Sequence, residues 1–201
     1  MPEIPIVFIE PRLGAVGFPG GPGFSYFNSN ASEEMKAALD ASAKWTEDQK
    51  NKVLNGLKLK YQSVTFRQYS ITSVDSLQAF LSAEKEAVGY LVVDLQGPSA
   101  LLQEILRVGK PVVLIAESLG GGGDYLLYHA RGDFERYPLV GIATKDLSSS
   151  EALGKVDYLL ALDKLRNTHA LVISNRDLSS TANQASRLTG ITFRLMSGHE
   201  F

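Results

Sequence analysis

The 201-residue sequence predicts an α/β fold in which helices cover both faces of a doubly wound, mostly parallel sheet. Short runs of consecutive apolar residues recur along the chain, and such runs are typical of strands that are buried on both faces. Amphipathic stretches separate them, and this alternation indicates parallel strands joined by right-handed crossovers. With 44% hydrophobic residues, the chain can bury a sizeable core.

Seven segments are predicted to be strands. They are residues 4–9, 64–71, 90–95, 111–116, 139–143, 170–174 and 191–196. The first five match the count of a flavodoxin-like or Rossmann-like three-layer sandwich. We expect this unit to span residues 1–165, with residues 166–201 as a continuation that is the truncated start of a second α/β domain.

The helices are predicted from amphipathic spacing and from capping signals. A helix that begins near Met35 is expected to restart at Thr46, because Thr46 and Gln49 have the spacing of a capping box. Ser148 and Glu151 repeat this spacing, and we expect them to open a long helix. Further helices are expected around residues 77–81 and 101–106.

Composition excludes several classes of function. Twenty basic and 22 acidic side chains give a net charge of −2, so no basic excess points to nucleic acid or to an anionic membrane. The absence of cysteine excludes disulfides, thiolate-held zinc, iron–sulfur clusters and cysteine nucleophiles. No signal-peptide pattern and no membrane-spanning apolar run occur, so we expect a soluble cytoplasmic protein.

The binding site is expected at the carboxyl ends of the strands, where open parallel sheets hold their ligands. Polar residues of both charge signs follow the predicted strands, and such a set could hydrogen-bond a hydroxyl-rich ligand. The alternative is that strand ends are polar only because they meet water. The residues are Glu10, Arg12, Ser70, Asp94, Gln96, Glu117, Ser118, Thr144, Lys145, Asn175 and Arg176. From this set we take Arg12, Gln96, Glu117 and Lys145 as substrate-binding candidates.

Four consecutive glycines, Gly120 to Gly123, lie between the fourth strand and a helix. Glycines allow the backbone to approach a ligand closely beside a helix N-terminus, so Gly120, Gly121 and Gly122 are also binding candidates. The segment is not a P-loop, because no Gly-Lys-Ser/Thr follows it. A tight turn or a subunit contact is the alternative explanation.

Other catalytic signatures are missing from the sequence. The glycine-rich loop after the first strand lacks the third glycine of the dinucleotide fingerprint, which disfavours a nicotinamide cofactor. The histidines, His129, His169 and His199, lack the spacing of a metal site. No Gly-x-Ser-x-Gly elbow is present. We therefore assign no catalytic residue and no metal ligand.

The second half of the chain resembles the amino-terminal region of the L-fucose/L-arabinose isomerase superfamily. The resemblance rests on five stretches, each read directly from the sequence. They are residues 92–98 (VVDLQGP), 109–117 (GKPVVLIAE), 120–125 (GGGGDY), 138–143 (PLVGIA) and 164–174 (KLRNTHALVIS).

The resemblance implies an aldose–ketose isomerase that is assembled from several domains. Such enzymes use a divalent metal, typically manganese, whose acidic and histidine ligands lie in later domains. The amino-terminal domain would contribute substrate binding, with Arg12 as a sugar contact, and the contacts of a homo-oligomer. We therefore expect this chain to bind a sugar-like ligand and to be inactive alone. The alternatives are a non-enzymatic module that binds a sugar or small metabolite and, less favoured, a flavin or nucleotide protein.

Overall fold

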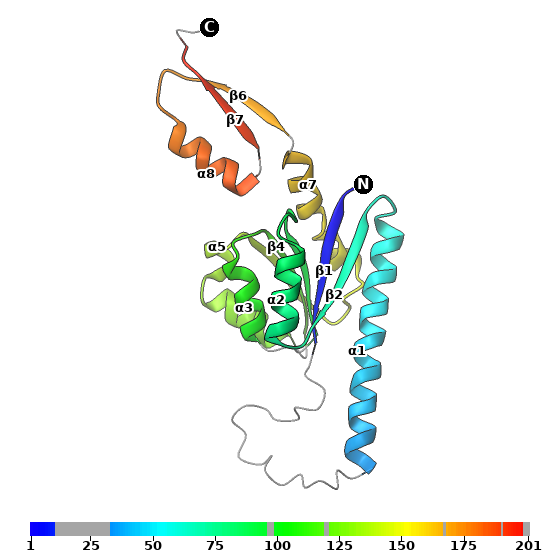
Figure 1. Cartoon of the computed structure of the whole chain (residues 1–201). Helices are drawn as coiled ribbons and strands as arrows, with labels where there is room; N and C mark the ends of the chain where they lie inside the picture. The colour runs from blue at the N-terminus through cyan, green and yellow to red at the C-terminus, as the bar shows by residue number, and fades with distance from the viewer. Residues whose placement is uncertain (11–32, 96–98, 119–120, 167, 190, 199–201) are drawn as a thin grey trace.

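A five-stranded, all-parallel sheet forms the centre of the computed structural model (Figure 1). The structure describes residues 1–10, 33–95, 99–118, 121–166, 168–189 and 191–198. The strand order is β2-β1-β3-β4-β5, which confirms the doubly wound α/β fold. The strands are β1 (Glu3–Ile9), β2 (Thr65–Ile71), β3 (Tyr90–Asp94), β4 (Val112–Glu117) and β5 (Leu139–Thr144).

Helices cover both faces of this sheet and complete a three-layer sandwich. The face covered by α1, α6 and α7 is called the α1 face here, and the face covered by α2, α3 and α4 is called the α3 face. The helices of the sandwich are α1 (Glu33–Lys60), α2 (Val74–Ala83), α3 (Ser99–Arg107), α4 (Gly122–Ala130), α5 (Asp133–Arg136), α6 (Ser150–Gly154) and α7 (Asp157–Arg166). No helix in the described ranges is long and apolar enough to cross a membrane.

Two apolar cores, one on each face, hold the layers together. On the α1 face, Phe8 and Val93 pack with Leu57 of α1. On the α3 face, Val92 packs with Phe80 of α2. Because successive strand side chains point to opposite faces, a strand that serves both cores must be apolar at every position. The continuous apolar runs in the sequence have this origin.

Two helix predictions are wrong in detail. Helix α1 does not restart at Thr46; instead, the Thr46 hydroxyl donates a hydrogen bond of 2.9 Å to the Ser42 carbonyl one turn earlier. A threonine inside a helix can satisfy its hydroxyl in this way without ending the helix. The expected long helix is divided into α6 and α7, and α6 is capped by the side chain of Ser149 rather than Ser148.

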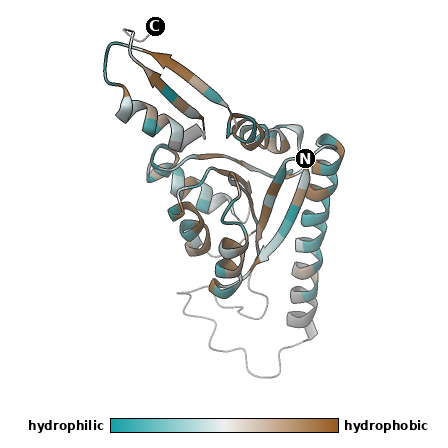
Figure 2. Cartoon of the chain, turned by 45° about the horizontal axis from the view of Figure 1, so that its top comes forward, coloured by the Kyte–Doolittle hydropathy of each residue, from teal (hydrophilic) through white to brown (hydrophobic). Residues whose placement is uncertain are grey.

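The last two strands form a separate parallel sheet. β6 (His169–Ile173) and β7 (Thr192–Met196) pair with each other and are connected by α8 (Ser179–Thr189). Leu171 and Ile173 are 53% and 45% exposed on this small sheet, and Figure 2 shows hydrophobic positions along it. The predicted boundary near Arg166 stays a prediction.

Candidate functional site at the carboxyl edge of the sheet

The sheet has a topological switch point between β1 and β3. From β1 the chain continues to β2 on one side, whereas β3 and the later strands lie on the other. Ile9 of β1 pairs directly with Asp94 of β3, and Glu10 follows at the strand end. Ligands of doubly wound sheets bind in the crevice at this point. We call the ends of the five strands here the carboxyl edge.

Lys50 connects three elements at the carboxyl edge. It lies on α1, and its ammonium group is 3.0 Å from Glu10 Oε1 and 3.3 Å from Glu47 Oε2. It also donates a hydrogen bond of 3.0 Å to the Ser70 hydroxyl at the end of β2. The three donors of the ammonium group therefore have three oxygen partners.

The environment of Lys50 favours its charged form. Burial alone would lower its pKa, but hydrogen bonds and charge from Glu10 and Glu47 outweigh this effect and raise the pKa above its usual value. Lys50 thus stays an ammonium group that positions Glu10, rather than a base.

A second carboxylate, Asp94, lies on the opposite face of the same edge. It is 1% exposed and packs beneath Gly121 at the start of α4. A Cβ atom on Gly121 would lie 2.8 Å from Asp94 Cγ, so only glycine fits there without a shift. Burial raises the pKa of Asp124 in the first turn of α4, and the charge of Arg131 partly offsets this rise.

Glu117 and Ser118 follow β4 and extend the polar edge. Glu117 is 5% exposed and shares the α1 face with Ile115 by strand alternation. The Ser118 hydroxyl oxygen is buried and has no hydrogen-bond partner among the described residues. A buried hydroxyl without a partner loses a hydrogen bond that a ligand group could supply.

The structure brings part of the predicted site together. Glu117, Gly121 and Gly122 lie at the ends of β4 and the start of α4, and Lys145 is exposed directly after β5. Three further candidates lie outside the described residues; they are Arg12, Gln96 and Gly120. The inclusion of Asn175 and Arg176 is wrong, because they follow β6 of the separate sheet and do not join this edge.

Lys50 is the residue that sequence reasoning did not single out. Its position in the middle of a long helix resembles that of any solvated lysine. A weak local signal exists, because Glu47 lies one turn before Lys50. The contacts to Glu10 and Ser70 depend on where α1 crosses the sheet, and no sequence pattern contains that information.

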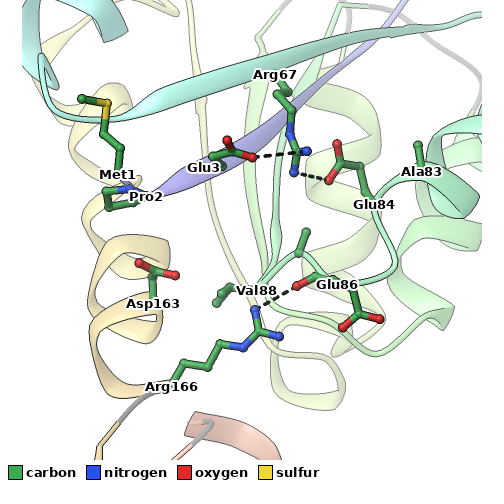
Figure 3. A pocket seen from close by; sticks show the side chains of 11 residues that line it. Met1, Pro2, Glu3, Arg67, Ala83, Glu84, Glu86, Val88, Asp163 and Arg166 are labelled. Carbon is green, nitrogen blue, oxygen red and sulfur yellow. Dashed lines mark hydrogen bonds and ion pairs between the residues drawn. The ribbon is translucent and has the colours of Figure 1, made fainter.

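The opposite, amino-terminal edge of the sheet contains a cavity of about 510 Å³ (Figure 3). Arg67 bridges Glu3 and the buried Glu84, and Arg166 donates a hydrogen bond to the Glu86 carbonyl. Arg67, Glu3 and Glu84 thus bind one another, and Arg166 binds a backbone carbonyl, rather than converge on the open space. The carboxyl edge, where parallel sheets hold their ligands, is the stronger candidate site.

Neither a metal centre nor a known relative defines the chemistry of the carboxyl edge. Within the described ranges, no group of three or more His, Asp or Glu residues is placed to hold a metal ion. The divalent metal that the isomerase resemblance implies thus has no matching ligand set in this part of the chain. Comparison with models of protein families, with curated proteins and with solved structures finds no match for the chain.

Proposed function

We propose that the chain is a cytoplasmic sugar-binding α/β domain, of the kind through which a fucose/arabinose-isomerase-like protein holds its substrate. The observation that supports this proposal is the set of polar groups at the switch point. Glu10, held by Lys50, and Asp94 flank the crevice between β1 and β3. A ligand at this point would meet the Glu10 carboxylate, whereas the Asp94 carboxylate is buried beneath Gly121.

The chemistry of the edge suits a ligand rich in hydroxyl groups. A sugar hydroxyl can donate to a carboxylate and accept from a lysine or serine at the same time. Carboxylates at Glu10 and Glu117, the unpartnered Ser118 hydroxyl and the exposed Lys145 supply both kinds of partner. The Lys50 donors are already used by three oxygens.

The proposal assigns binding, and no chemical step, to this chain. Isomerisation of an aldose needs a group that moves a proton and a centre that polarises two substrate oxygens. The described residues supply no ligand set for such a metal centre. The second candidate function is a non-enzymatic module that binds a sugar or small metabolite.

Titration followed by two-dimensional ¹H–¹⁵N NMR tests the proposal. L-fucose, L-arabinose and ribitol would be added separately to the labelled chain. We expect the amide signals of Glu10, Leu95, Ser118 and Gly121 to shift, because these residues surround the crevice. Signals that shift with the two aldoses support the isomerase-type domain, and signals that shift only with other metabolites support the second candidate.

Matched variants locate the binding site. Ser118→Ala and Glu117→Gln are expected to reduce the ligand-induced shifts of the amide signals, because each removes a group proposed to bind a sugar hydroxyl. Glu86→Gln changes an exposed carboxylate at the opposite edge and is expected to leave it unchanged. Unshifted signals with every polyol, or shifts that cluster around Glu86, would reject the proposal.

A further inference from the structure

We propose that β5 is a docking strand for a second copy of this chain, with the two β5 strands pairing antiparallel across a twofold axis at Gly141. β5 is the last strand of the five-stranded sheet. β4 pairs with one side of it, and no strand in the described ranges pairs with the other. Pairing of two such edges would join the two sheets into one.

The two edges of the sheet differ in how they are protected. The β2 edge carries Arg67, which is held by Glu3 and Glu84. A charged side chain of this kind discourages another strand from pairing. β5 has the sequence LVGIAT, with no charged residue and no proline. It therefore lacks the side chains that usually block pairing at an edge.

The backbone of β5 presents its outer groups in a self-complementary pattern. The Pro138 and Thr144 carbonyls accept hydrogen bonds from β4 and from the residue after it, at 2.8 and 3.0 Å. Strand alternation then turns the backbone groups of Leu139, Gly141 and Ala143 away from β4. A twofold axis at Gly141 places this residue opposite its own copy and Leu139 opposite the second copy's Ala143.

Two described contacts touch this outer edge. The Leu139 amide donates a hydrogen bond of 2.7 Å to the Tyr137 carbonyl of its own chain, so the pairing rests on the Gly141 and Ala143 amides and on the outward carbonyls. The Tyr125 hydroxyl lies 3.5 Å from the Gly141 carbonyl oxygen, at the long limit of a hydrogen bond. A strand amide at ordinary distance would make the better bond, and the hydroxyl can rotate toward water. Tyr125 therefore does not protect the edge.

The side chains match in the same register. Val140 would lie opposite the second copy's Ile142 on the α1 face, and the reverse pair would form across the axis. Both side chains are only partly buried and already pack on the core of that face. Cross-strand pairs of β-branched residues stabilise a sheet. Pairing would thus cover apolar surface that one copy leaves half-exposed.

Charge complementarity supports a second copy as the partner. Arg136 precedes β5 and Asp146 follows it, and both are exposed. Arg136 ends α5 and Asp146 follows β5, so neither is a strand residue, but antiparallel pairing places the Arg136 end of one copy beside the Asp146 end of the other. The same twofold axis therefore brings together outer backbone groups, apolar pairs and residues of opposite charge.

Size-exclusion chromatography with light scattering tests this interface on the 201-residue chain. We expect a dimer that becomes a monomer with Ala143→Pro, because proline removes an outward amide that the single sheet does not use. Ala143→Val keeps that amide and is the matched control, so it should remain a dimer. Circular dichroism would establish that all variants are folded.

Two further experiments give independent readouts. One swaps the charges of Arg136 and Asp146, and the other measures amide hydrogen exchange. Arg136→Asp and Asp146→Arg should each weaken the dimer, and the double variant should restore it. In the unmodified chain, hydrogen exchange at the Gly141 and Ala143 amides should slow as concentration rises. A monomer at every concentration, a dimer insensitive to Ala143→Pro, or protection that grows at Leu171 and Ile173 instead would overturn the proposal.

Discussion

The Lys50 ammonium group lies 3.0 Å from Glu10 Oε1, and this ion pair ties the middle of α1 to the carboxyl end of β1. The ammonium nitrogen also lies over the Phe8 ring, 5.7 Å from the ring centre. Lys50 thus covers the end of the α1-face core with its stem and binds the strand-end carboxylate with its charge. It both fixes the helix and orients Glu10 at the switch point.

Replacing this lysine tests its structural contribution. We expect Lys50→Met to lower the free energy of unfolding by about 1–2 kcal/mol, because a charge-assisted bond is lost and Glu10 stays partly buried. Urea unfolding at neutral pH measures the change. Lys52→Met, at an exposed position of the same helix, is the matched control and should change stability by less than about 0.5 kcal/mol.

The difference in stability between the unmodified protein and Lys50→Met should depend on pH. The folded-state pKa of Lys50 is raised above its ordinary 10.5. The extra stability is therefore fully present below pH 10.5 and is lost as pH rises through the higher folded value. The difference between the unmodified protein and Lys50→Met should shrink in that range. A difference that stays constant with pH would contradict the role given to the charge.

Tyr90 gives a second pH prediction. Burial, and then the charge of Glu84, raise the pKa of this tyrosine from 10.0 to about 12. Its stabilising effect is thus complete below pH 10 and is lost as pH rises toward about 12. The free energy of unfolding, measured at a series of pH values, should fall less steeply between pH 10 and about 12 for Tyr90→Phe than for the unmodified protein. Parallel curves would show that the phenol is not buried as described.

Gly121 gives a prediction with its control in the same segment. A Cβ atom there would lie 2.7 Å from the Asp94 carbonyl oxygen, whereas one on Gly123 would meet nothing within 4 Å. Gly121→Ala should therefore destabilise the protein by about 1–3 kcal/mol. Gly123→Ala, inside α4, should stabilise it by up to about 1 kcal/mol, because alanine favours a helix. Thermal unfolding distinguishes the two signs, and equal effects would contradict the close packing over Asp94.

The sequence was sufficient for the strands and insufficient for long-range contacts. Apolar runs predict β1, β3 and β4 because burial on both faces requires apolar residues at consecutive positions. The more exposed strands β2, β6 and β7 were also predicted, from shorter or more polar runs. The helix restart at Thr46 was wrong because a capping pattern is local, whereas the packing of α1 along the sheet is not. Lys50 was missed for a related reason, since its partners Glu10 and Ser70 are distant in sequence.

At the candidate site, too, local signals were predicted correctly and long-range arrangements were not. The strand-end rule correctly places Glu117 and Ser118 at the carboxyl edge, because it needs only the strand boundaries. It fails for Asn175 and Arg176 because a strand run does not reveal which sheet the strand joins. Assignment of a strand to a sheet depends on backbone hydrogen bonds between distant segments, and these leave no mark on local composition.

The small sheet of β6 and β7 is predicted to open more easily than the central sheet. A two-stranded sheet in which Leu171 and Ile173 of β6 are 53% and 45% exposed buries too little surface to be stable by itself. The amides of Ala170 and Val172 should therefore exchange with solvent faster than that of Val92 in β3. Native-state hydrogen exchange measures both in one sample, so β3 is an internal control. Equal protection would show that the small sheet unfolds only with the rest of the chain. Protection that rises with concentration would show that a second copy covers this face, and β5 would then not be the docking strand.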